Sequence, residues 1–269
     1  MQPAAGRNTV GRRFFVVGVS AMLASQAFPG ELPQATALIR RILESRRGGV
    51  VRARGRLVVT DAGRQQRVFQ LLVLRKRLAR SLNLLWSITD PPEARLRILV
   101  ESPLEGRATV WRGSGARGRA AVVPTETWGR AILGSHVTIE DLVDDYFTWP
   151  KQTLTGEEAV SGKMCYILRS ETAEGRAATY GSVTTWVDQA TLVPLRIVKE
   201  PRAPGAEKEI VCRGVRRTGG HWIASNIEFR IRGTAGSTKI VFTGGSENAR
   251  VKDSEVDPRA ALSADGDFR

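Results

Sequence analysis

The chain has 269 residues, of which 42% are hydrophobic, and a formal net charge of +14. This length can bury a sizeable core, as one large β domain or as two ordinary domains. The basic excess would suit nucleic acid, but the basic residues are spread along predicted strands and the chain begins like an exported protein, so we exclude a nucleic-acid partner. Two interpretations of the charge stay open: solvated outer faces, or attraction to anionic lipid head groups, worth about 1 kcal/mol per basic residue near a charged surface.

Residues 1–27 predict a signal peptide. A basic region, an apolar core and a small-residue cleavage site follow one another there: Arg7, Arg12 and Arg13, then residues 14–24, then residues 25–27. The Arg12–Arg13 pair also fits twin-arginine export, so both export routes stay open. No cysteine follows the apolar core, and no other stretch is long and apolar enough to span a bilayer. We therefore expect residues 28–269 to form a single exported domain.

Residues 33–46 predict a helix that ends at Gly48–Gly49. Leu38 and Ile42 belong to one apolar stripe along it, together with Ile39 and Leu43. We predict that this stripe lines part of a cavity. The alternative is a helix that simply covers one end of a β structure.

From residue 50 onward the pattern predicts strands. Apolar residues alternate with polar ones, and short turns rich in Gly, Asp and Asn separate the runs. Serial antiparallel strands usually stay adjacent, so the fold class is mainly β: a strongly curved antiparallel sheet or incomplete barrel, or a closed up-and-down barrel. A final helical turn is expected over residues 257–262. The expected strands are 51–59, 66–76, 81–86, 95–100, 107–112, 119–123, 154–161, 164–171, 179–188, 192–200, 207–216, 222–232 and 237–246.

Residues 130–146 interrupt the strands with a short helical signal. Thr138 is a good N-cap, because its hydroxyl can accept the unpaired amide of Asp141. Ile139, Leu142 and Val143 recur at helical spacing and make one apolar face. A short amphipathic helix among strands is suited to a lid over a hydrophobic cavity.

Several ordered segments resemble the periplasmic outer-membrane lipoprotein-sorting proteins, the LolA/LolB-like group. Leu133-Gly134-Ser135 and residues 138–142 resemble that group's "LGSDF(S/T)YEDL" segment, with His136 where the group usually has Asp. Residues 162–168 resemble its "G(R/K)xCYxLE" strand, residues 186–188 with 193–196 its "WIDxxxxxPLR" hairpin, and residues 220–223 its "DGxWVP" segment. Together these matches cover about residues 130–242.

The resemblance implies a periplasmic protein that binds the acyl chains of lipoproteins or other lipids in its cavity. It also implies inner- and outer-membrane proteins as possible further partners. The predicted function is a carrier that contributes to outer-membrane lipoprotein or lipid sorting. The alternative is a non-transporting envelope sensor or interaction protein with the same fold.

Tryptophan residues supply further candidates for the cavity wall. Trp111 and Trp128 precede the lid segment closely, although tryptophan also fills ordinary barrel cores. The predicted cavity and lid residues are Leu38, Ile42, Trp111, Trp128, Leu133, Ile139, Leu142 and Val143.

Catalytic chemistry has few possible actors. Ser135 and His136 lie near Asp141, but adjacent residues generally cannot face each other across a site, so we predict no enzyme. No metal-binding spacing, phosphate-cradling loop or dinucleotide motif is present, so no cofactor is expected. Cys165 and Cys212 are the only cysteines, and two interpretations stay open: a disulfide, or two buried free thiols.

Overall fold

The computed structural model describes residues 34–47, 50–104, 106–114, 120–173, 178–218, 221–246 and 250–263. The predicted signal peptide lies outside these residues. All described residues belong to one compact unit. No helix among them is long and apolar enough to cross a membrane.

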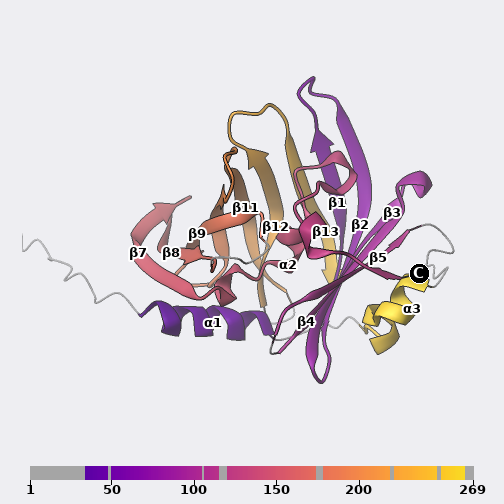
Figure 1. Ribbon diagram of the computed structural model, residues 1–269, viewed down its shortest axis with the longest axis horizontal. Helices are drawn as coiled ribbons and strands as arrows, with labels where there is room; N and C mark the ends of the chain where they lie inside the picture. The colour runs from indigo at the N-terminus through magenta and orange to yellow at the C-terminus, as the bar shows by residue number, and fades with distance from the viewer. Residues whose placement is uncertain are drawn as a thin grey trace, which may run out of the picture. The chain divides into compact units, whose positions relative to one another are not determined.

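The described chain forms one 13-stranded antiparallel sheet (Figure 1), which confirms the predicted fold class. The alternating pattern explains it, because strand β1 buries every second residue of its central part. The strands are β1 (Val51–Thr60), β2 (Gln66–Arg77), β3 (Ser81–Asp90), β4 (Leu96–Pro103), β5 (Thr109–Ser114), β6 (Ala121–Val122), β7 (Lys151–Val160), β8 (Lys163–Glu171), β9 (Tyr180–Asp188), β10 (Pro194–Pro201), β11 (Lys208–Thr218), β12 (His221–Ile231) and β13 (Ser237–Ser246).

Two meanders join edge to edge to make this sheet. Strands β1–β6 form one meander and β7–β13 the other, and the first strand pairs with the last from Arg52 opposite Ser246 to Thr60 opposite Ser237. The outer strands are β6 and β7, which do not pair with each other. The sheet is therefore an incomplete barrel, and the closed up-and-down barrel is wrong.

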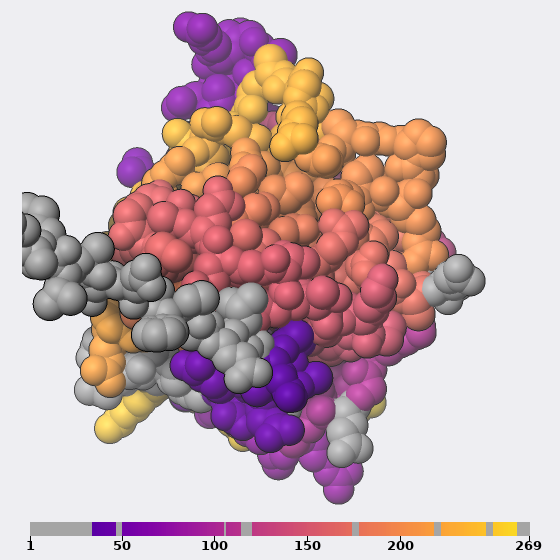
Figure 2. All heavy atoms as spheres, turned by 90° about the vertical axis from the view of Figure 1, so that its left-hand side faces the viewer, coloured from indigo at the N-terminus to yellow at the C-terminus, as the bar shows by residue number. Residues whose placement is uncertain are grey.

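The helices cover different parts of the sheet. Helix α1 (Ala35–Arg47) lies across one end of β7–β9, whereas α3 (Pro258–Ser263) lies beside β4 and β5 (Figure 1). A view from the side of β7 shows the strands of the second meander as one continuous surface, with α1 in indigo against its lower margin (Figure 2). The other helical segments are α2 (Ile139–Val143) and the 3₁₀ turns η1 (Pro92–Ala94), η2 (Thr125–Thr127), η3 (Ile132–Gly134), η4 (Tyr146–Thr148) and η5 (Asp253–Val256).

The main core lies on the inner face of the sheet, the face that packs against α1 and α2. Leu38 and Ile42 of α1 are fully buried there, and Leu57, Phe229 and Ile240 of the strands belong to the same cluster. A second cluster occupies the outer face, where α3 covers part of the first meander. Its buried members are Leu72, Leu74, Leu85, Leu99, Val251, Val256, Ala261 and Leu262.

The predicted N-cap of α2 is confirmed. The Thr138 hydroxyl accepts the amide of Asp141 at 3.4 Å, and the Asp141 carboxylate accepts the amide of Thr138 at 2.9 Å. This reciprocal capping box fixes the start of the helix. The helix ends at Asp144, which adopts the left-handed conformation.

Gly55 of β1 lies where the two meanders approach closely, so a substitution at this residue tests their packing. A Cβ added there would lie 2.5 Å from the carbonyl oxygen of Val241 on β13, a distance that forces the backbone to move. We expect Gly55→Ala to lower the free energy of unfolding by about 1–3 kcal/mol, as overpacking does. Gly244→Ala is the matched control, because a Cβ on that residue of β13 meets nothing within 4 Å. Equal denaturation midpoints for the two variants would contradict the expectation.

Candidate functional site

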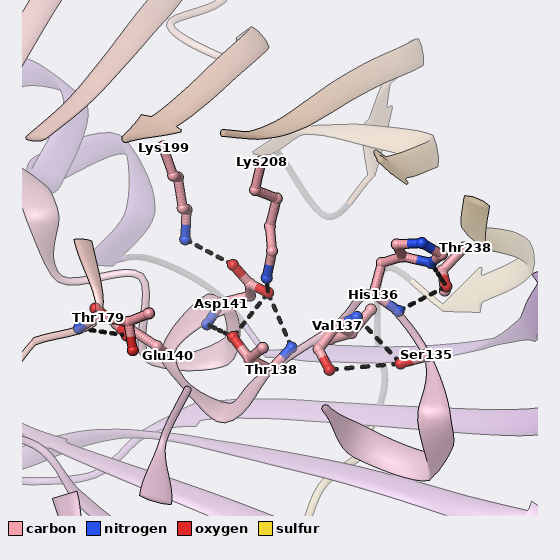
Figure 3. Close-up of polar contacts among 10 residues, drawn as sticks. All are labelled: Ser135, His136, Val137, Thr138, Glu140, Asp141, Thr179, Lys199, Lys208 and Thr238. Carbon is pink, nitrogen blue, oxygen red and sulfur yellow. Dashed lines mark hydrogen bonds and ion pairs between the residues drawn. The ribbon is translucent and has the colours of Figure 1, made fainter. Parts of the chain in front are cut away.

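A buried ion cluster joins α2 to the sheet. The Asp141 carboxylate accepts a hydrogen bond from the ammonium group of Lys199 on β10 at 2.8 Å and another from that of Lys208 on β11 at 2.7 Å (Figure 3). The three side chains are only 2–4% exposed. Two cations therefore share one carboxylate inside the protein.

Strand periodicity explains why both lysines point inward. Lys199 is two residues from Ile197 on β10, and Lys208 is two residues from Ile210 on β11. Residues two apart in a strand share a face, and both isoleucines belong to the inner core. The sequence carried this signal, but the prediction treated the basic residues as solvated or lipid-facing, so the cluster was missed.

The pKa values in the cluster follow from burial and from the excess of positive charge, because two ammonium groups contact one carboxylate. Burial alone would raise the pKa of Asp141, but the two ammonium groups outweigh it and hold that pKa well below its usual range. Burial opposes the charge on Lys199, but Asp141 and Asp144 compensate it and raise its pKa. For Lys208 burial outweighs the attraction of Asp141 and lowers the pKa, and the like charge of Lys199 lowers it further.

Further bonds hold the segment that precedes Asp141. Glu140 accepts the backbone amide of Thr179 at 3.1 Å. His136 donates its backbone amide to the hydroxyl of Thr238 on β13 at 2.8 Å, and its Nδ1 lies 2.9 Å from the same oxygen (Figure 3). The predicted lid segment is thus attached to both sides of the inner face.

An apolar pocket of about 610 Å³ lies beside the cluster. Its apolar walls come from β1, β2 and β3 on one side and from β10–β13 and the β9–β10 turn on the other: Val51, Ala53, Val73, Leu84, Leu192, Val193, Pro194, Ile197, Ile210, Cys212, Trp222, Ile223, Ala224, Ile227, Phe229 and Phe242. We call this the inner pocket. Most of its wall is hydrocarbon, so it suits an apolar ligand.

Charged groups of both signs complete the wall of the inner pocket. Arg46, at the end of α1, donates to the Asp144 carboxylate at 2.7 Å. Arg75, Asp141 and Lys199 also face the pocket. These groups stand where α1 and α2 meet the strands, so the pocket is apolar with a polar region on its wall.

The eight predicted cavity residues do not line the inner pocket. Leu38 and Ile42 are fully buried in the core, and Val143 is 8% exposed and belongs to the same cluster. Leu142 packs partly buried against that cluster. These four side chains therefore belong to the main core and not to the wall of the pocket.

The other four line other pockets or pack against the second cluster. Leu133 and Ile139 line a second pocket of about 300 Å³ near β4 and β6, and Trp128 lines a third of about 320 Å³ beside Thr179. Trp111 packs against the cluster under α3. The structure places these residues in separate environments.

The residues considered for catalysis have structural partners instead. The Ser135 hydroxyl donates to the carbonyl of Val137 at 3.4 Å and accepts its amide at 3.1 Å, whereas His136 contacts Thr238. Asp141 is engaged by the two lysines. Ser135 and His136 are thus not arranged as a nucleophile and its base.

Both cysteines are free thiols. Cys165 is buried beside Val193 and Leu195, and Cys212 lines the inner pocket, where burial raises its pKa to about 12. The described residues contain no group of three or more His, Cys, Asp or Glu side chains that could hold a metal.

Comparisons with known proteins identify the fold. A family model described as an uncharacterized protein matches residues 102–260, which is more than half of the chain. The search of curated proteins found no match to this chain. A putative outer membrane lipoprotein-sorting protein domain from Vibrio parahaemolyticus superposes with a TM-score of 0.75 at 14% identity, over 83% of this chain and 96% of the other. A DUF1329 family protein from Desulfovibrio piger gives 0.74 at 19% identity, over 86% and 100%. A LolA superfamily protein from Nitrosomonas europaea gives 0.62 at 15% identity, over 84% and 98%.

Asp141→Asn tests the buried cluster. The variant leaves two buried ammonium groups without their counter-ion, so we expect the free energy of unfolding to fall by about 3–5 kcal/mol in urea titrations. Asp253→Asn is the control, since that carboxylate pairs with Lys76 at 2.7 Å but is 77% exposed. A similar small effect in both variants would show that the cluster does not hold α2 in place.

The acid dependence of stability provides a separate test. The pKa of Asp141 is lowered in the folded protein, so its contribution is present above the unfolded value of about 3.9 and is lost as the pH falls toward the folded value. The difference in unfolding free energy between the wild type and Asp141→Asn should therefore be constant from pH 7 to about pH 5 and should narrow below about pH 4. If the unfolding free energies of the two proteins stay parallel down to acid pH, the lowered pKa of Asp141 is contradicted.

Proposed function

We propose that this chain, which has the LolA-like fold that its sequence predicted, binds a lipid acyl chain in the inner pocket. The single observation that carries the proposal is the pocket's nearly continuous apolar wall. Its volume of about 610 Å³ falls within the range of about 300–1,000 Å³ typical of small-molecule sites.

The energetics favour reversible binding. Each buried methylene contributes about 0.8 kcal/mol, so eight methylenes contribute roughly 6 kcal/mol. That amount alone corresponds to a dissociation constant between about 1 mM and 1 μM, from which a ligand leaves readily. A pocket that buries part of one chain therefore suits a carrier that must release its cargo.

The cargo proposed is the acyl part of a lipoprotein or another envelope lipid. The fold supports this, because one structural neighbour is named as a lipoprotein-sorting domain. The positive charges of Arg46 and Arg75 on the pocket wall offer contacts for the polar end of such a molecule. The proposed location is the periplasm, reached through the export signal predicted in residues 1–27.

We further propose that the protein binds without turnover and that α2 is a fixed wall. Ser135 and His136 are engaged by Val137 and Thr238, which supports binding over catalysis. The buried bonds of Asp141 favour a stationary α2. The cargo would then enter between the β9–β10 turn and the start of β12, where residues 191–194 and 222–224 line the pocket.

Val73→Trp tests the pocket directly. Val73 is a partly buried wall residue on β2, and an indole at this position fills space that the ligand needs. We expect the affinity for a fluorescent fatty acid to fall at least about tenfold, which corresponds to two displaced methylenes.

The matched control is Val58→Trp. Val58 is a partly buried residue of β1 that alternates with the inner residues Leu57 and Val59, so its side chain lies on the outer face. This variant should retain the wild-type probe affinity. If both variants bind the probe as the wild type does, while remaining folded by circular dichroism, the inner pocket is not the binding site.

A further inference from the structure

The entrance proposed above for the inner pocket, which we call its mouth, lies at one end of the sheet. Residues 191–194 of the β9–β10 turn and residues 222–224 of β12 contribute to its wall. We call these two segments the rim. Strand pairing places the start of β1 at the same end, because Arg52 lies opposite Ser246, the last residue of β13. The β1–β2 hairpin lies at the opposite end, where Thr60 pairs with Gln66.

Trp222 on the rim is exposed to solvent. Its exposed fraction is 46%, whereas Trp86 and Trp149 are exposed by only 2% and 4%. Water is a poor environment for the large apolar part of an indole ring. Such a ring, with its polar N–H, is well suited to the boundary between lipid head groups and hydrocarbon.

Two arginines accompany this tryptophan on the β11–β12 hairpin. Arg217 lies directly opposite Trp222, and Arg216 lies opposite Ile223. Both arginines are exposed, and neither forms an ion pair with a described residue. Elsewhere on the same strand, Arg213 does pair with Glu228, at 3.2 Å. Among the described residues, no carboxylate pairs with the two arginines at this hairpin end.

The neighbouring turn at this end adds to the charge. Strand β2 ends at Arg77 and β3 begins at Ser81, so this turn lies beside the start of β1. Arg77 and Arg80 are both exposed. Positive charge and an exposed indole thus occur together at the pocket mouth.

We propose that the rim and the tip of the β11–β12 hairpin dock onto an anionic phospholipid bilayer. The arginines attract the charged head groups, and Trp222 enters the head-group region beside the pocket mouth. This inference rests on the proposed function, because docking there lets an acyl chain pass between bilayer and pocket without crossing water. The charge complementarity favours a bilayer over a second copy of this basic chain.

Vesicle flotation of the purified protein tests the docking. The wild type should float with vesicles of phosphatidylcholine and phosphatidylglycerol in equal parts, less so with phosphatidylcholine alone, and added salt should weaken its binding. Arg216→Gln with Arg217→Gln should weaken binding by about 25-fold, at about fivefold per arginine. Trp222→Ala should weaken it as well.

The control removes equal charge from the opposite end of the sheet. Arg64 and Arg95 are exposed in the β1–β2 and β3–β4 turns, and changing both to Gln should leave flotation within about fivefold of the wild type. If the two double variants lose vesicle binding equally, net charge alone explains the binding and the proposal is overturned. Unchanged flotation of both the Arg216/Arg217 double variant and Trp222→Ala would also overturn it. If the wild type does not float at all, the surface would fit an acidic protein partner instead.

A second measurement does not depend on the arginine variants. Brominated lipids should quench the fluorescence of the vesicle-bound wild type more strongly than that of Trp222→Phe, and equal quenching would overturn the docking site. Binding of the fluorescent fatty acid in solution separates the two proposals. The double variant Arg216→Gln with Arg217→Gln changes no residue of the pocket wall, so it should bind the probe like the wild type but bind vesicles more weakly. Val73→Trp should bind vesicles like the wild type but bind the probe more weakly.

Discussion

The contact of one carboxylate with two lysines determines how the inner face is covered. Asp141 caps α2 through Thr138 and accepts both Lys199 and Lys208, so a single side chain sets the helix start and attaches it to two strands. Replacing a buried ion pair by apolar residues is often neutral or stabilising, whereas removing one partner is costly. The intact cluster therefore need not add to overall stability, but losing Asp141 is costly, because its bonds attach α2 to β10 and β11.

With α2 at this position, part of the inner face stays uncovered, and the inner pocket lies there. The side chains of α1 and α2 pack into the core around Leu38 and Ile139, whereas the strands beyond the cluster contribute apolar residues such as Ile227 and Phe242 that no helix covers completely. The outer strands β6 and β7 do not pair, so the curved sheet is open along one side. The pocket thus follows from the incomplete barrel together with a helix held at a fixed place.

Much of the fold was predictable from local sequence patterns, but the site was not. Period-two alternation predicted the strands, and the Thr138–Asp141 spacing predicted the N-cap, because both depend on neighbouring residues. The pocket depends on which strands the curved sheet brings face to face, so Val73 and Phe242, far apart in the chain, gave no common signal. Trp111 illustrates the difficulty, since only the position of α3 decides that it faces the second cluster.

The lysines show why charge was the least informative feature of the sequence. A basic residue at an inward strand position is expensive unless a carboxylate meets it, and Asp141 arrives from a segment some sixty residues earlier. The net charge of +14 therefore combines different populations: Lys199 and Lys208 are buried against Asp141, whereas Arg216 and Arg217 face solvent on the β11–β12 hairpin. Composition counts all of these alike. Only the pairing partners separate the cations that hold the fold together from those available to an external anionic surface.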